Sequence, residues 1–306
     1  MKIETNQAKA KVAYHRLTSG LYDKPLRFYN QEEALCHVYS EQGFVSIFSG
    51  GDESQFQFGN YQCVQSKPIA DDLLGIAISH VKKLGAKRVI GPMHGNTFLP
   101  YRFSLTDEKS LPSEIVHKEY YANQWQEFGF RICDKYYAKK SFLKQVSKAE
   151  NIKLDYLDWE KWQQVSKENL LNDLYLFTHR SFGANWYFKE ISFDQFRSIY
   201  EPILHMLNTP LSQIVYDGEH IVGLLFAFAH EDFAEEVFVK TVARAPADRY
   251  KGIASVMSTR FVNTAHELGF KTHYHLYLHQ NNKSRLISEK FGGKVFKEYA
   301  LFSLKL

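Results

Sequence analysis

The chain is poor in cysteine, in long apolar runs and in long blocks of one charge. Its three cysteines, Cys36, Cys63 and Cys133, are scattered, form no CxxC pair and fit no closed disulfide framework. We expect reduced thiols. No stretch approaches the roughly 18 consecutive apolar residues of a membrane span, and the first residues contain no apolar signal-peptide core. The sequence therefore predicts a cytoplasmic protein without a membrane segment.

Charge and length limit the classes of function further. The 38 basic and 34 acidic residues give a net charge of +4, and without a basic block no nucleic-acid surface is indicated. An anionic small molecule needs no more than local positive charge. The 306 residues, 44% hydrophobic and 15% aromatic, suffice for two domains with substantial cores.

The hexapeptide Arg249–Ala254, RYKGIA, is the most informative segment. The strand-like run Val237–Val242 precedes it, and an amphipathic run closed by Gly269 follows it. A strand, a glycine-containing loop and a helix together present backbone N–H groups and a positive helix end to a phosphate. A plain β–α turn is the alternative. In the helix, apolar residues recur every three or four positions and predict one buried stripe, made of Ile253, Met257, Phe261, Ala265 and Leu268.

An altered copy of this loop lies 184 residues earlier. Gln65–Ala70 matches Arg249–Ala254 at Lys, Ile and Ala, and the Leu-Gly of Leu84–Lys87 falls on that of Leu268–Lys271. A third match, of Trp125–Tyr136 with Ser288–Tyr299, has an offset of 163. The difference predicts an insertion of 21 residues between Gly85 and Trp125. We interpret the chain as a duplication.

The predicted fold class is α/β (α+β), with two tandem domains that each contain a mixed twisted sheet flanked by helices. Residues 1–145 form a degenerate N-terminal domain and residues 146–306 a C-terminal domain; they join within the polar segment 141–155. In the second half we expect helices over about 158–180, 192–207, 253–268 and 282–291. Expected strands are a hairpin turned by Asp217-Gly218, runs at 236–244 and 271–278, and final strands through 294–306.

These residues resemble the GCN5-related N-acetyltransferases. Their signature, Gln/Arg-x-x-Gly-x-Gly/Ala between a strand and a helix, reads here Arg249-x-x-Gly252-x-Ala254. Pro246 precedes it as in many members, Asn281-Asn282 opens the next helix, and Phe291-Gly292 stands where the family often has Leu-Gly. The match covers about 190–306, and reaches the first half through the repeat. The whole chain is similar to a tandem, two-copy member.

The resemblance implies acetyl-CoA or another acyl-CoA as cosubstrate, with no metal. The backbone of the loop would hold the pyrophosphate, Arg249 and Lys251 would add charge, and the strand end would hold the pantetheine arm. The cofactor-binding residues predicted in this way are Val242, Arg244, Arg249, Tyr250, Lys251, Gly252, Ile253, Ala254 and Asn282. In the first copy Pro68 replaces Gly252 and removes a donor. We therefore expect that copy to bind CoA poorly and to serve as scaffold or as a wall of the acceptor cleft.

Residues for proton transfer are less well indicated. The family's tyrosine acid falls on Ser288, so Tyr299 and Tyr250 are further candidates for the acid, and Glu236 is the candidate base. His273 and His275 share one strand face without a convincing third metal ligand. The inserted region brings His94, Asn96, Tyr101 and Arg102, which would contact acceptor or pack on their own sheet.

The leading hypothesis is an acyl-CoA-dependent N-acyltransferase acting on a small-molecule or peptide amine, as a monomer or homodimer. One alternative is an aminoacyl or peptidyl transferase of related tandem fold, although no basic RNA-binding stretch is evident. The other is a non-catalytic CoA-binding or interaction protein, which the serine at 288 favours.

Overall fold

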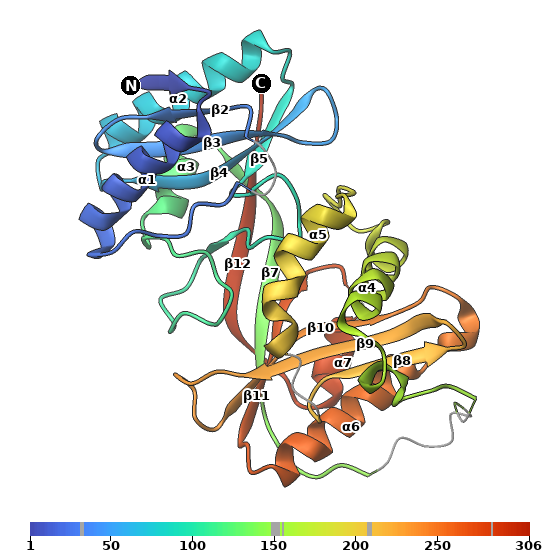
Figure 1. Cartoon of the computed structure of the whole chain (residues 1–306). Coiled ribbons are helices and arrows are strands. Elements are labelled where there is room, and N and C mark those ends of the chain that lie inside the picture. The colour runs from blue at the N-terminus through green and yellow to red at the C-terminus, as the bar shows by residue number, and fades with distance from the viewer. Residues whose placement is uncertain (31–33, 148–153, 155, 207–209, 283) are drawn as a thin grey trace. The chain divides into compact units, whose positions relative to one another are not determined.

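The computed structural model describes residues 1–30, 34–147, 154, 156–206, 210–282 and 284–306. The chain divides into two compact units (Figure 1). The first contains Met1–Lys135, Tyr187–Lys189 and Glu298–Leu306, and the second contains Tyr136–Trp186 and Glu190–Lys297. Within the described part of the chain, no helix is both long and apolar enough to cross a membrane.

The first unit is a sheet with the order β1-β2-β3-β4-β5-β12, and β6 pairs with β12. Within it β4 and β5 are parallel and the other pairs are antiparallel. Its elements are β1 (Lys2–Glu4), α1 (Gln7–Tyr22), β2 (Cys36–Tyr39), β3 (Gly43–Ser49), β4 (Gln55–Cys63), α2 (Lys67–Lys83), β5 (Arg88–Gly91), β6 (Phe103–Ser104), α3 (Tyr121–Phe128) and the C-terminal part of β12 (Lys294–Lys305).

The second unit is a sheet with the order β8-β9-β10-β11-β7, in which β10 and β11 are parallel. Its elements are most of β7 (Arg131–Phe142), a 3₁₀ turn (Lys161–Gln163), α4 (Lys167–Phe182), α5 (Phe193–Tyr200), a 3₁₀ turn (Glu201–Met206), β8 (Gln213–Asp217), β9 (His220–Ala229), β10 (Glu236–Arg244), a 3₁₀ turn (Asp248–Tyr250), α6 (Ile253–Glu267), β11 (Thr272–His279) and α7 (Ser284–Lys290).

Local sequence explains the elements around the predicted loop. The Asp217-Gly218 turn joins β8 to β9 as expected, and Gly218 has a φ of 57°. The predicted stripe of α6 is buried at four of its five positions; Leu268 follows the helix end and is 52% exposed, so its inclusion was wrong. α6 packs closely against β9 at Gly223. A Cβ added to Gly223 would lie 2.7 Å from the Ile253 side chain.

The internal duplication is present in the elements themselves. β5 and β11 begin 184 residues apart, at Arg88 and Thr272, whereas β7 and β12 begin 163 residues apart, at Arg131 and Lys294. The last two each contain 12 residues. The final segment is thus one long strand, and the expectation of several strands there was wrong. The offset changes between β5 and α3, where the insertion was expected.

The last strand of each copy completes the sheet of the other unit. Phe302 of β12 pairs with Gly91 of β5, and Lys139 of β7 pairs with His275 of β11. These two pairings are equivalent under the offsets of 163 and 184, so the exchange is reciprocal. The compact units are therefore discontinuous in sequence, whereas the expected division after residue 145 concerns the two copies along the chain and stays a prediction.

Candidate functional site

The parallel strands β10 and β11 separate partway along their length. They pair from Glu236↔Thr272 to Val239↔His275, after which β10 continues to Arg244 and β11 to His279. Irregularities mark the separation on both sides: β10 shifts register on β9 just after Val239, and β11 shifts on β7 after His275. Within the described residues no further β10–β11 pairing occurs. Backbone groups at this edge of β10 are thus offered to an extended ligand.

The loop after β10 ends at a helix N-terminus that has no side-chain cap. Arg244, at the end of the strand, donates through its guanidinium to the carbonyls of Ala245 at 2.7 Å and Ala247 at 3.1 Å, which fixes the turn. Gly252 is the N-cap of α6, with a φ of 97° and no side-chain cap. The helical ladder begins with the Val256 N–H donating to the Gly252 carbonyl, so the three preceding N–H groups have no partner in the helix. Such an end attracts an anion.

Two predicted loop residues bind a carboxylate of the protein itself. The Tyr250 hydroxyl donates to Asp217 at 2.7 Å, and the Arg249 guanidinium lies 3.0 Å from the same carboxylate. Burial, and then the hydrogen bond to Asp217, raises the pKa of Tyr250. Both side chains thus tie the loop to the β8–β9 turn. Arg249 remains 68% exposed and Lys251, paired with Asp248, 66% exposed, so both stay predicted phosphate ligands.

A cation that the sequence analysis missed lies at the start of α6. The Lys290 ammonium, from α7, donates to the Ser255 hydroxyl at 2.9 Å. Ser255 is in the first turn of α6, so this side chain adds positive charge where the helix end is already positive. One signal was available: at the offset of 163 the first copy has Glu127 in this place. The opposite charges of Glu127 and Lys290 at equivalent positions indicate a difference between the two copies at this point.

The other candidates for proton transfer, Ser288, Tyr299 and Glu236, have different surroundings within their own units. Ser288 is 1% exposed on α7, and within the described residues its hydroxyl has no hydrogen-bond partner. Tyr299 belongs to the first unit and donates to Glu114 at 2.6 Å. Glu236 accepts from Tyr274 at 2.9 Å and from Lys140 at 3.3 Å. Glu236 is the first residue of β10, whereas the loop to α6 follows the last residue of that strand, Arg244.

Two other predicted residues shape the chain around the site. The Asn282 side chain accepts from the Ser284 N–H at 2.9 Å and so begins α7. The backbone of Val242 pairs with Leu225 on β9, which leaves its opposite edge toward β11. Neither role conflicts with the prediction that these residues border the cofactor.

The equivalent region of the first copy is closed by the inserted segment. After β4 and β5 pair over 55–57, the Met93 N–H donates to the Phe58 carbonyl at 2.8 Å. The backbone of Met93 then lies directly on Gly59, where an added Cβ would be 2.4 Å from the Met93 carbonyl. Pro68 stands in the first turn of α2. The Met93 contact occupies the space that a pantetheine arm would need. Pro68 has no N–H to donate to a phosphate.

The histidines of the predicted strand face are buried. Burial lowers the pKa of His273 to about 4, and that of His275 to about 3 with help from His273 and Lys139. Both rings are therefore neutral near pH 7. In the part of the chain that the structure describes, no three His, Cys, Asp or Glu side chains gather as a metal site.

Separated parallel strands beside a glycine-capped helix define an α/β unit that is suited to a phosphate-bearing extended ligand. No family model and no curated protein matches this sequence. Solved structures do match it in fold. A GCN5-related N-acetyltransferase from Sphaerobacter thermophilus superposes with a TM-score of 0.52 at 12% identity, over 99% of this chain and 95% of that one.

Two further structures agree over the full length. A tandem GNAT protein from the clavulanic acid biosynthesis pathway has a TM-score of 0.53 at 8% identity, over 99% of this chain and 98% of that one. An acetyltransferase of the GNAT family from Colwellia psychrerythraea has a TM-score of 0.50 at 13% identity, over the whole of both chains. The chain therefore has the fold of a tandem GCN5-related N-acetyltransferase.

Proposed function

We propose that the chain is an acyl-CoA-dependent N-acyltransferase whose donor site lies in the second copy. The observation that carries the proposal is the combination of the β10–β11 separation with the Gly252-capped end of α6. The first would border the pantetheine arm and the second the pyrophosphate. Lys290 adds a cation beside the same helix end. Acetyl-CoA is the donor to test first.

The acyl-CoA supplies the activated acyl group, and the chain supplies binding and orientation. Gly252 lets the backbone adopt a φ of 97°, which residues with a side chain rarely take. Arg244 and the contacts of Arg249 and Tyr250 with Asp217 hold the loop in one conformation. A loop fixed before binding loses less entropy when the ligand arrives.

Proton transfer is assigned to Glu236 as the candidate base. Its carboxylate accepts from Tyr274 and Lys140, and these two bonds would orient it as an acceptor. Glu236→Gln should lower the rate most on the plateau above the acidic limb of the pH–rate profile, and should flatten that limb. Tyr274→Phe is the matched control, because it removes one hydrogen bond to Glu236 but leaves the carboxylate. Equal profiles for Glu236→Gln and the natural chain would exclude this base.

The deciding experiment is to incubate the chain with acetyl-CoA and a panel of amines while following free thiol. Thiol release that requires both acetyl-CoA and one class of amine supports the proposal. CoA binding without thiol release for any amine would instead favour a CoA-binding protein without transfer, which the buried Ser288 hydroxyl and the engagement of Tyr299 by Glu114 make the second candidate. Absence of CoA binding would reject both.

A further inference from the structure

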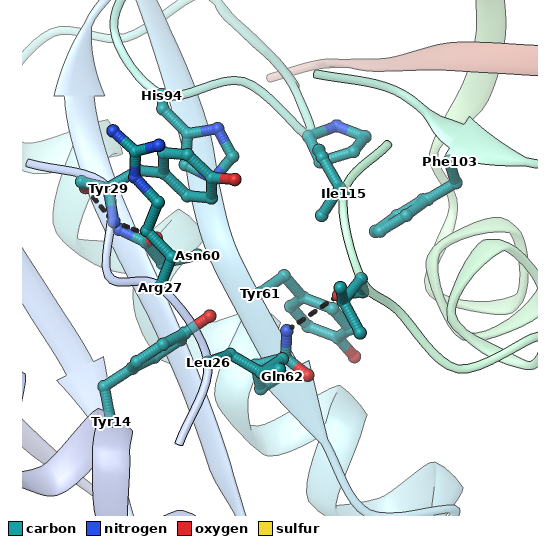
Figure 2. A pocket seen from close by; sticks show the side chains of 12 residues that line it. Tyr14, Leu26, Arg27, Tyr29, Asn60, Tyr61, Gln62, His94, Phe103 and Ile115 are labelled. Atoms are coloured by element: carbon teal, nitrogen blue, oxygen red, sulfur yellow. Dashed lines mark hydrogen bonds between the residues drawn. The ribbon is translucent and has the colours of Figure 1, made fainter. Parts of the chain in front are cut away.

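The first unit contains a pocket that is covered by the inserted segment, which the second copy lacks. It lies where the inserted segment covers β4, and it opens to solvent. α1 contributes Tyr14, the chain after α1 contributes Arg27 and Tyr29, and the insertion contributes His94 and Ile115. Figure 2 shows Arg27, Tyr29 and His94 together on one side, with Ile115 and Phe103 on the other.

The polar side chains at the base of the pocket are already satisfied by the protein. Asn60 accepts from the Tyr29 N–H and donates to the Tyr29 carbonyl. Gln62 accepts from two tyrosine hydroxyls and donates to the Val116 carbonyl. His94 is paired through Nδ1 with the Pro100 carbonyl at 2.8 Å. These hydrogen bonds fix the shape of the pocket. A ligand would therefore be recognised by side chains other than Asn60, Gln62 and His94.

Arg27 is the group that these bonds do not use. Its guanidinium lies over the Tyr29 ring, 5.2 Å from the ring centroid. Among the described residues, no carboxylate forms an ion pair with Arg27, and no described residue lining the pocket is acidic. A planar guanidinium held against an aromatic ring presents a fork that matches a carboxylate.

The remaining walls are apolar or aromatic. Tyr14, Tyr61 and Phe103 line the space together with Leu26 and Val116. A ligand that satisfies both the cation and these walls is a small acid with one apolar body, such as a single ring or a branched chain.

We propose that the first copy is a binding unit for a small apolar monocarboxylate, which the exposed Arg27 anchors against the aromatic walls of the open pocket. In this copy the inserted segment closes the space between β4 and β5, where a CoA site would lie. The same segment forms the wall of a separate ligand site. Because the site uses no part of the Gly252 loop, it is independent of the proposed transferase activity. Its occupant would be bound without being acylated.

Calorimetric titration of the full chain, without acyl-CoA, tests the proposal. The probes are acetate, isovalerate, benzoate, phenylacetate and cinnamate, each used up to about 10 mM so that millimolar affinity is detected. Phenylacetamide, equal in shape to phenylacetate but uncharged, is the matched ligand control. We expect at least one ring-bearing or branched acid to bind, acetate to bind at least about tenfold more weakly, and phenylacetamide to bind at least about tenfold more weakly than phenylacetate.

Three variants complete the test. Arg27→Gln should weaken the acid by at least about tenfold, and Arg16→Gln, which removes an exposed charge from α1, should not. Ile115→Trp fills the pocket and should abolish binding while keeping Arg27. The proposal is overturned if no acid of the panel binds, if phenylacetamide binds as well as phenylacetate, or if Arg27→Gln and Ile115→Trp leave the affinity unchanged.

Discussion

At the scale of single residues, the two copies differ most at Gly252 and Pro68. Gly252 has a φ of 97° at the N-cap of α6, whereas Pro68 stands in the first turn of α2 and has no N–H to donate. Sequence comparison of the copies was enough to predict that difference. It did not predict that Met93 also closes the first copy, because a backbone contact made by an insertion has no sequence pattern.

Gly252→Ala should weaken CoA binding by at least about tenfold, because an alanine strains the positive φ and its Cβ approaches the phosphate. The matched control is Gly269→Ala at the other end of α6, where φ is 88° and nothing lies within 4 Å of an added Cβ. Both variants should lose about 1–2 kcal/mol of stability. Calorimetry with CoA distinguishes them, and equal CoA affinity in the two variants would contradict the assignment of the site.

The buried histidines predict how stability depends on pH. Burial lowers the pKa of His275 to about 3, against about 6.5 in the unfolded chain. Below pH 6.5 the unfolded chain therefore binds a proton that the folded chain does not, and stability falls as the pH falls from 6.5 toward 3. His37, His94 and His273, each lowered to about 4, act in the same direction.

Urea unfolding at several values between pH 7.5 and 5 measures this effect. His275→Asn should lose about 2 kcal/mol less stability over that range than the natural chain, because one unfavourable protonation is removed. His266→Asn, at an exposed position on α6, should leave the slope unchanged. A slope in His275→Asn as steep as in the natural chain would mean that this ring is protonated in the folded state.

At the scale of elements, most helices and strands of the second half could be predicted from periodicity and turn residues. β10 occupies Glu236–Arg244 and α6 begins at Ile253, as expected. The separation of β10 from β11 could not be predicted, because it depends on register shifts against two neighbouring strands. The same limit applies to Asp217, whose contact with the loop joins elements that are distant in sequence.

Lys290 provides the element-scale test of the proposed CoA site, since its side chain joins α7 to the first turn of α6. Lys290→Gln should weaken CoA binding about fivefold, in keeping with roughly 1 kcal/mol for a cation beside a bound phosphate, and the loss should shrink as salt is added. Lys271→Gln removes an equal charge beyond the opposite end of α6 and should leave the affinity unchanged. An affinity that does not distinguish the two variants would remove Lys290 from the site.

At the scale of the whole molecule, the reciprocal strand exchange follows from which side chains each strand carries. β12 places Phe302 and Leu304 against the apolar core of the first unit. β7 places Lys139 and Ser141 opposite His275 and His273, where Lys139 is 5% exposed and paired with Glu289 at 2.7 Å. The two strands have the same length and equivalent registers, so we expect their side chains to decide which sheet each one completes.

This argument predicts that residues 1–145 do not fold alone. Without β12, the strand available beside β5 is β7, and Lys139 would then replace Phe302, whose ring lies 6.3 Å from that of Trp125 and 6.1 Å from that of Phe103. A lysine without its carboxylate in that core costs several kcal/mol, comparable with the stability of a small domain. The matched control is the same fragment with residues 131–142 replaced by residues 294–305, which restores both apolar side chains at unchanged length. Amide NMR spectra should be well dispersed for the replaced fragment and collapsed for the natural one. Equal dispersion in both would show that side-chain chemistry does not direct the exchange, because β7 would then complete either sheet.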